Sequence, residues 1–348
     1  MFNKYMRSYF IRRFLFILPT FLGITLVSFV IMHIVPGGPI EQAIRQIRMG
    51  GQFGEGGGGS GNFVSSTLTN EAIEQMRKDY GFDQPILIRY GHWLWNILRL
   101  DLGTSYVYGD PVWHVIKSRL PVSIYFGVIG FFMTYLVCIP LGVMKAVKHK
   151  QLFDTITSIL VFVGYATPGF ALGIVLLVLF GGGSFWDVFP LGGFVSDNFS
   201  DLSFFAKVVD LLHHTILPVI CYMISSFATL TILMKNSLLD NLNQDYILTA
   251  FSKGLRSRVV VYKHALRNSL IPLATGFGHF LSVILAGSFL IEKVFNIDGM
   301  GLLGYTSIID RDYPVVLGIL VISSLLGLIG NIISDICYVL IDPRIEFR

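Results

Sequence analysis

Long runs without charged residues dominate the chain. Six of them are each long enough to cross a bilayer as a helix of roughly 20 residues. A bilayer offers no water to unpaired backbone groups, so we expect these runs to be helical. Prolines within or beside the runs do not change this expectation, because transmembrane helices tolerate proline. The runs are Phe14–Ile40, Leu120–Met144, Thr155–Trp186, Leu211–Met234, Asn268–Ile291 and Tyr313–Ser334.

The composition favours the same fold class. Of the 348 residues, 53% are hydrophobic and 14% are charged, and the mean hydropathy is +0.66. Soluble domains are charged at about a quarter of their positions, so this chain lacks the polar surface of a soluble globule. We predict an all-α polytopic membrane protein with six transmembrane helices. The net charge of +4 is not concentrated in one basic tract, so we expect no nucleic-acid partner.

Positive charge indicates which ends of the runs face the cytoplasm. With the N-terminus inside, 15 of the 26 Lys and Arg residues fall in inner segments. Of the 11 in outer segments, 8 lie in one long loop. Long loops contribute little to the positive-inside rule, so the short loops decide. We expect both termini in the cytoplasm.

This topology divides the chain into four parts. The first is an N-terminal cytoplasmic segment with the first helix, and the second is a small outer subdomain that contains a Gly-rich linker. Five helices with a basic inner loop form the membrane core, and a short cytoplasmic tail follows. The corresponding residues are 1–35, 36–119 with the linker at 50–61, 120–341 with the inner loop at 235–270, and 342–348.

Motifs for covalent chemistry are missing from the sequence. It has no Walker-type phosphate loop, no HExxH, no paired CxxC and no GxSxG. The three cysteines lie far apart in apolar runs, and the adjacent His213 and His214 point to different helix faces. We therefore expect no catalytic residue, no cofactor and no metal site.

The inner loop holds the most informative stretch. Asp245–Lys253 is short and polar, and Gly254 follows it as a helix C-cap would. A short helix that is fixed at both ends on the cytoplasmic face is suited to docking on another protein. An ordinary solvated loop is the usual interpretation of such a basic segment, so the pattern alone leaves both open.

The motif DYILTAFSKGL…HALRNSLIP, from Asp245 to Pro272, resembles the cytoplasmic loop of permease subunits in binding-protein-dependent ABC importers. More narrowly, it resembles the dipeptide and oligopeptide permeases. In that family the loop forms a coupling helix that sits in a cleft of the ATPase subunit. The chain departs from the family at Phe251 and Ser252, where Arg and Ala are expected. The coupling residues implied are Asp245, Tyr246, Thr249, Ala250, Lys253, Gly254, Leu255 and Arg256.

The resemblance extends over nearly the whole chain. Its motifs include IRRFLFILPTFLGITLVSFVIMHIVPGGP (Ile11–Pro39), DLGTSY (Asp101–Tyr106) and GMGLLGY…RDYPVVLG (Gly299–Gly318). It implies the type I ABC importer permease fold in the bacterial inner membrane, with the outer subdomain in the periplasm. The Gly-rich insert and GGGSFWDVFPLGG (Gly181–Gly193) look closest to broad-specificity peptide permeases that also admit peptide-nucleotide antibiotics of the microcin C kind.

This family implies a transport subunit that takes up peptides and catalyses no reaction itself. The implied partners are a second homologous permease, separate ATPase subunits and a periplasmic peptide-binding protein. A path for peptides needs polar groups among the apolar ones. The candidates are Ser225, Ser226, Thr229, Thr231 and His279. Small-residue helix packing is an alternative role for the Ser and Thr residues, and a neutral, hydrogen-bonded histidine is an alternative for His279.

Two other classes of function compete with the importer. A stand-alone secondary transporter or channel needs ionisable coupling residues within the membrane, and the sequence offers only His279 and Asp335. Asp335 lies close to the inner boundary, where capping or pairing would also explain it. An intramembrane enzyme needs a constellation of acids, His or Ser and Lys, which the sequence does not contain.

Overall fold

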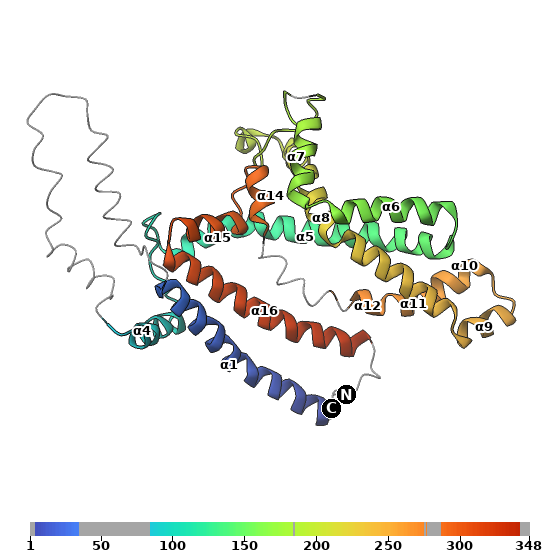
Figure 1. Cartoon of the computed structure of the whole chain (residues 1–348), viewed down its shortest axis with the longest axis horizontal. Helices are drawn as coiled ribbons and strands as arrows, with labels where there is room; N and C mark the ends of the chain where they lie inside the picture. Colours follow the sequence, from blue (N-terminus) through green and yellow to red (C-terminus); the bar gives the residue numbers. More distant parts are fainter. Residues whose placement is uncertain (1–3, 35–83, 184, 275, 277–286, 342–348) are drawn as a thin grey trace, which may run out of the picture. The chain divides into compact units, whose positions relative to one another are not determined.

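The computed structural model describes residues 4–34, 84–183, 185–274, 276 and 287–341, and these form helices joined by short loops (Figure 1). The helices are α1 Lys4–Ile34, α4 Ile86–Leu98, α5 Val112–Val147, α6 Leu152–Ala166, α7 Gly169–Phe180, α8 Phe204–Leu242, α9 Asp245–Ser252, α10 Ser257–Val259, α11 Leu266–Ser269, α12 Ile271–Ala274, α14 Phe289–Val294, α15 Met300–Ile309 and α16 Tyr313–Ile341, with a 3₁₀ turn at Phe199–Asp201 and a π-helix at Val260–Ala265.

Four described helices are long and apolar enough to cross a membrane, namely α1, α5, α8 and α16. They contain four of the six predicted runs, and Pro19, Pro140 and Pro218 lie inside them. A fifth span is formed if α6 and α7 count as one. The remaining run, Asn268–Ile291, lies partly outside the described residues. The described part of the chain is thus helical with four or five apolar spans.

The third run differs from its prediction as one helix. It breaks at Thr167, and α7 leaves α6 at an angle of 101° (Figure 1). Pro168 starts α7, and the preceding Thr167 is extended with ψ 118°. Proline disfavours the helical conformation of the residue before it, which explains the break. The sequence did not distinguish Pro168 from the three prolines that helices accommodate.

Two compact units make up the chain. The larger comprises Met1–Leu15, Arg119–Leu303 and Leu325–Arg348, and the smaller comprises Phe16–Ser118 and Gly304–Ser324. The predicted outer subdomain falls in the smaller unit and is described only from residue 84 onward. The linker at 50–61 lies outside the described residues.

Two apolar clusters form the core of the larger unit. One joins α8 to the segment that follows it, through Met234, Leu238 and Ile247, all fully buried. The other packs α5 against α8 and α14 around Phe126 and Cys221. Residues of this kind drive burial in soluble cores, and here they fix helices that also expose apolar faces.

The smaller unit is held together by a buried carboxylate. Asp312 accepts hydrogen bonds from the Ser105 hydroxyl and from the backbone N–H groups of Tyr106 (3.1 Å) and Val107 (3.3 Å). These bonds fasten the loop before α5 to the start of α16. Gly318 of α16 faces Val112 so closely that an added Cβ would lie 2.7 Å from its methyl group.

Gly142 of α5 makes the closest helix contact of this kind in the larger unit that we select for a test. A Cβ there would lie 2.6 Å from Met234 Cβ and 2.9 Å from the Thr231 carbonyl oxygen. We expect Gly142→Ala to lower the free energy of unfolding by about 1–3 kcal/mol, because neither helix can yield. Thermal unfolding of the purified protein in detergent measures this.

Gly130→Ala on the same helix is the matched control. Its Cβ would meet Tyr222 Cβ at 3.5 Å, an ordinary contact. Alanine favours a helix over glycine by roughly 0.5–1 kcal/mol, so stability should stay equal or rise. Equal losses in the two variants would contradict the close packing of α5 on α8.

Candidate functional site

A short helix follows directly on the long helix α8. It is α9, Asp245–Ser252, and Gly254 comes after its last turn with φ +75°. The Gly254 N–H donates to the Phe251 carbonyl (2.9 Å) and the Leu255 N–H to that of Ala250 (3.4 Å). Positive φ costs glycine little, so the chain reverses sharply here. The C-cap predicted from the sequence is confirmed.

One face of α9 is anchored to the core. Ile247 is fully buried and Ala250 nearly so, in the cluster that contains Leu238 of α8. The Tyr246 hydroxyl donates to Asn241 Oδ1 (2.9 Å) and accepts from Asn268 Nδ2 (3.1 Å). This phenol therefore joins the end of α8, α9 and α11 into one body, which we call the coupling segment (residues 235–270).

The opposite face of α9 exposes apolar side chains. Leu248 is 57% exposed, Phe251 43% and Leu255 38%. Large apolar groups gathered on an exposed surface mark interaction sites more often than scattered ones do. Of the coupling residues implied by the resemblance, Ala250 is buried, and the following are exposed: Asp245, Tyr246, Thr249, Lys253, Gly254, Leu255 and Arg256.

Behind the coupling segment lies a buried charge cluster. Lys235 of α8 donates to both carboxylate oxygens of Asp154 (2.8 and 2.7 Å). Lys145 of α5, with a side chain only 1% exposed, lies 3.2 Å from Asp154 Oδ1. Its ammonium also donates to Ser158 Oγ (2.7 Å) and Thr157 Oγ1 (3.0 Å). One carboxylate therefore links α5, α6 and α8.

A cavity of about 510 Å³ opens between α5, α8 and the residues that precede α14. Two predicted path residues, Ser226 and Thr229, line it. Thr231 is fully buried and is not among the described lining residues. The side chain of Ser225 and all of His279 lie outside the described residues. Polar lining that the sequence analysis missed comes from Ser123, Thr134, Tyr135, Tyr222 and Ser288.

One wall of this path cavity is fixed by Glu292, which is 1% exposed. Its carboxylate accepts from the Tyr222 hydroxyl (3.2 Å) and from the N–H groups of Ser288 (3.2 Å) and Leu302 (2.6 Å). Burial raises the pKa of the Glu292 carboxyl, and these hydrogen bonds oppose the rise. Tyr222 and Ser288 are thereby held in place at the cavity.

The remaining ionisable candidates have local partners. Asp335 forms an ion pair with Arg13 and accepts a hydrogen bond from the Tyr9 hydroxyl (3.3 Å). His213 and His214 bond to the carbonyl oxygens of Val188 and Asp210. Among the residues that the structure describes, no three His, Cys, Asp or Glu side chains gather as a metal site would require.

Comparison with known proteins gives the family. The model of the binding-protein-dependent transport system inner membrane component matches residues 138–347, more than half of the chain. This chain belongs to that family. The peptidoglycan transport system permease protein YejB of Agrobacterium fabrum is 43% identical over 99% of both chains.

Two further relatives agree over their full lengths. The inner membrane ABC transporter permease protein YejB of Escherichia coli is 43% identical, over 99% of this chain and 100% of that protein. The oligopeptide transport system permease protein AppB of Bacillus subtilis is 35% identical, over 98% and 100%. The chain is a permease subunit of a peptide ABC importer, a multi-pass inner-membrane protein that transports and is not an enzyme.

The charge cluster makes a test of how this permease holds α5, α6 and α8 together. We expect Asp154→Asn to lower the free energy of unfolding by about 3–5 kcal/mol, because it leaves the buried Lys145 without its counter-charge. Lys235→Met should cost less, since Asp154 keeps Lys145 and the Lys235 side chain is 16% exposed. Unfolding of the purified protein in detergent ranks the two, and a reversed order would contradict this account.

Proposed function

We propose that this permease pairs with a second, homologous permease and that its coupling segment docks α9 into a cleft of an ATPase subunit. The observation that carries the proposal is the two-sided burial of α9. Ile247 and Ala250 fix the helix to the core, while Leu248 and Phe251 remain exposed. An ATPase and a periplasmic binding protein are the partners that the family implies.

The chemistry of the exposed face fits a protein cleft. Leu248, Phe251 and Leu255 supply an apolar centre, and Lys253 and Arg256 supply charges at its edge. Interfaces commonly have such an apolar core with a polar rim. The departure from the family at Phe251 places an aromatic ring at the centre of this face, where it adds apolar area.

A rigid coupling segment also suits the transmission of movement. Closure of the ATPases would displace α9, and the Tyr246 bonds to Asn241 and Asn268 would carry that displacement into α8 and α11. Lys235 on α8 would pass it through Asp154 to α5 and α6. Rigid-body movement of helices around a fixed site is one of the established forms of conformational switching.

For the topology we propose six spans with both termini in the cytoplasm. The positive charges in short loops support this orientation. It places the subdomain 36–119 in the periplasm and the loop 235–270 inside, between the parts 1–35, 120–341 and 342–348. The coupling segment would then face the compartment that holds ATP.

For the substrate we propose oligopeptides that pass through the path cavity. Its hydroxyl groups, including Ser226 and Thr229, can exchange hydrogen bonds with a peptide backbone, and its aromatic walls tolerate varied side chains. The relatives are named for peptidoglycan and oligopeptide transport. Peptide-nucleotide antibiotics of the microcin C kind are included in the proposed range.

Docking is tested by a charge on the exposed face of α9. We expect Phe251→Asp to reduce co-purification of the ATPase and peptide uptake at least tenfold, since a desolvated aromatic anchor contributes 2 kcal/mol or about more. The amount of permease in the membrane should not change, because Phe251 is exposed. Leu100→Asp, at a position 89% exposed in the smaller unit, is the control.

Retained ATPase binding by Phe251→Asp would refute the docking of this face. Uptake that continues without any ATPase would instead support the stand-alone transporter. Gly254→Asn and Gly254→Val add a second comparison at φ +75°. Asn tolerates that conformation and Val does not, so uptake should survive the first change better.

The path is tested by filling the cavity. We expect Thr229→Leu to lower uptake of a tripeptide at least tenfold while ATPase co-purification and thermal stability stay near wild type. Thr231→Val is the matched control, because Thr231 is buried on the same helix outside the described lining. If Thr229→Leu lowers stability and assembly together with uptake, the role of Thr229 is helix packing.

A further inference from the structure

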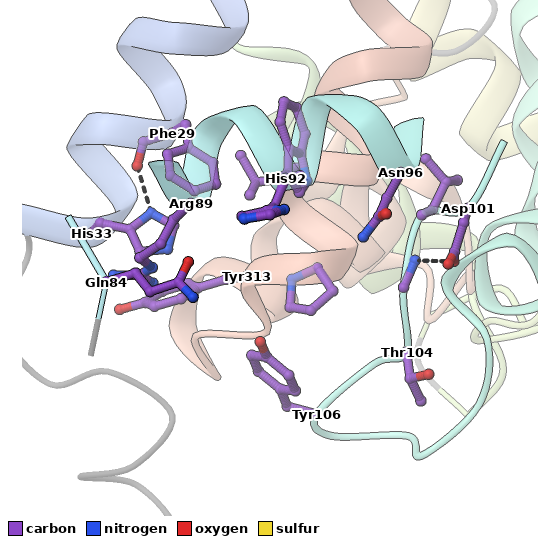
Figure 2. Close-up of a pocket in the computed structure, with 15 residues that line it drawn as sticks. Phe29, His33, Gln84, Arg89, His92, Asn96, Asp101, Thr104, Tyr106 and Tyr313 are labelled. Atoms are coloured by element: carbon purple, nitrogen blue, oxygen red, sulfur yellow. Dashed lines mark hydrogen bonds between the residues drawn. The ribbon is translucent and has the colours of Figure 1, made fainter. Parts of the chain in front are cut away.

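A second cavity, of about 550 Å³, lies in the smaller unit along α4 (Figure 2). Its floor is aromatic and well fixed. The rings of Phe29 and His33 stack at 4.1 Å between centroids, Phe29 and Trp93 meet at 5.5 Å, and His33 and Tyr313 at 5.8 Å. The Thr25 hydroxyl bonds to that of Tyr90 (2.9 Å), which holds α4 against α1.

The rim of this cavity, which we call the α4 groove, is a row of polar side chains. Arg89, His92 and Asn96 recur three and four residues apart, so they share one face of α4. Asp101 continues the row beyond the helix end, where its N–H donates to the Asn96 carbonyl (3.0 Å) and its Oδ1 accepts from Gly103 N–H (2.9 Å). Figure 2 shows Arg89 at one side, Asp101 at the other, and His92 and Asn96 between them.

The two ends of the groove carry opposite charge. Arg89 lies in the first turn of α4, where the helix dipole is positive, and Asp101 lies past the last turn, where it is negative. From Arg89 to Asn96 the helix rises roughly 10 Å, at 1.5 Å per residue. An extended peptide covers at most about 3.3–3.6 Å per residue, so roughly three residues match this length.

A buried hydroxyl in the floor also lacks a partner. Tyr313 lines the groove and is 5% exposed, and its hydroxyl makes no hydrogen bond within the described part of the chain. Buried polar groups are nearly always paired, so such a group calls for a partner such as a ligand or a water. A peptide backbone, with both donors and acceptors, meets this need.

We propose that the α4 groove binds a free peptide of about three residues, with its carboxylate at Arg89 and His92 and its ammonium at Asp101. An isolated anion would not use Asp101, and an isolated cation would be repelled by Arg89. The site is separate from the path cavity, all of whose described lining belongs to the larger unit. Its placement outside the membrane rests on the topology proposed above, whereas its chemistry does not.

The experiment measures peptide binding to the purified importer complex without its binding protein. The probes are trialanine, Nα-acetyl-trialanine and trialanine amide, followed by titration calorimetry and tryptophan fluorescence. We expect trialanine to bind and to change the fluorescence, because Trp93 forms part of the floor. Trp93→Phe should remove the fluorescence change, and Trp186→Phe, on the loop after α7, should keep it.

Two substitutions test the two ends separately. Arg89→Gln should weaken trialanine at least tenfold and leave the weaker binding of the amide unchanged. Asp101→Asn should do the same for trialanine while leaving the acetylated peptide unchanged, and its amide oxygen can still accept from Gly103. Arg89→Lys should restore part of the affinity, and Lys117→Gln, an exposed site on the same unit, should have no effect.

The proposal is overturned if neither end responds, or if all three probes weaken equally in both variants. It is also overturned if trialanine does not bind and the groove is protected only when the binding protein is added, since the groove would then be a protein contact. Thr229→Leu should leave trialanine binding intact. Failure of this test therefore leaves the docking and path proposals untouched.

Discussion

The burial of one carboxylate, Asp154, is the constraint on which the larger unit depends. A charge removed from water must be paired and hydrogen-bonded, or it costs several kcal/mol. Asp154 meets this condition through Lys145 and Lys235, which come from two different helices. The requirement therefore fixes α5, α6 and α8 relative to one another at the point where α8 runs on into the coupling segment.

The same requirement recurs at the ends of other apolar runs. Glu292 is satisfied by Tyr222 and by backbone N–H groups, Asp312 by the loop before α5, and Asp335 by Arg13. Each of these acids borders a run and joins segments that lie far apart in the chain. Electrostatic satisfaction within each unit thus does the joining that apolar packing, which lacks direction, leaves unspecific.

Function in this permease is divided among parts with different physical demands. The coupling segment needs stiffness, which the Tyr246 hydrogen bonds and the buried Ile247 provide. The path cavity needs polar groups that do not bind too firmly, and hydroxyls such as Ser226 and Thr229 fit that need. The α4 groove offers fixed charges at a set spacing, which suits recognition of a peptide by its two ends.

The sequence by itself determined the membrane class, the location of most helices, the family and the glycine turn after α9, because each follows from a pattern along one segment. Only the tertiary structure decided that Pro168 breaks its run, that Ser226 and Thr229 line the cavity while Thr231 does not, and that Lys145 and Lys235 meet at one carboxylate. These outcomes depend on which helix faces meet. A linear pattern gives the period of a helix but not the partner against which each face packs.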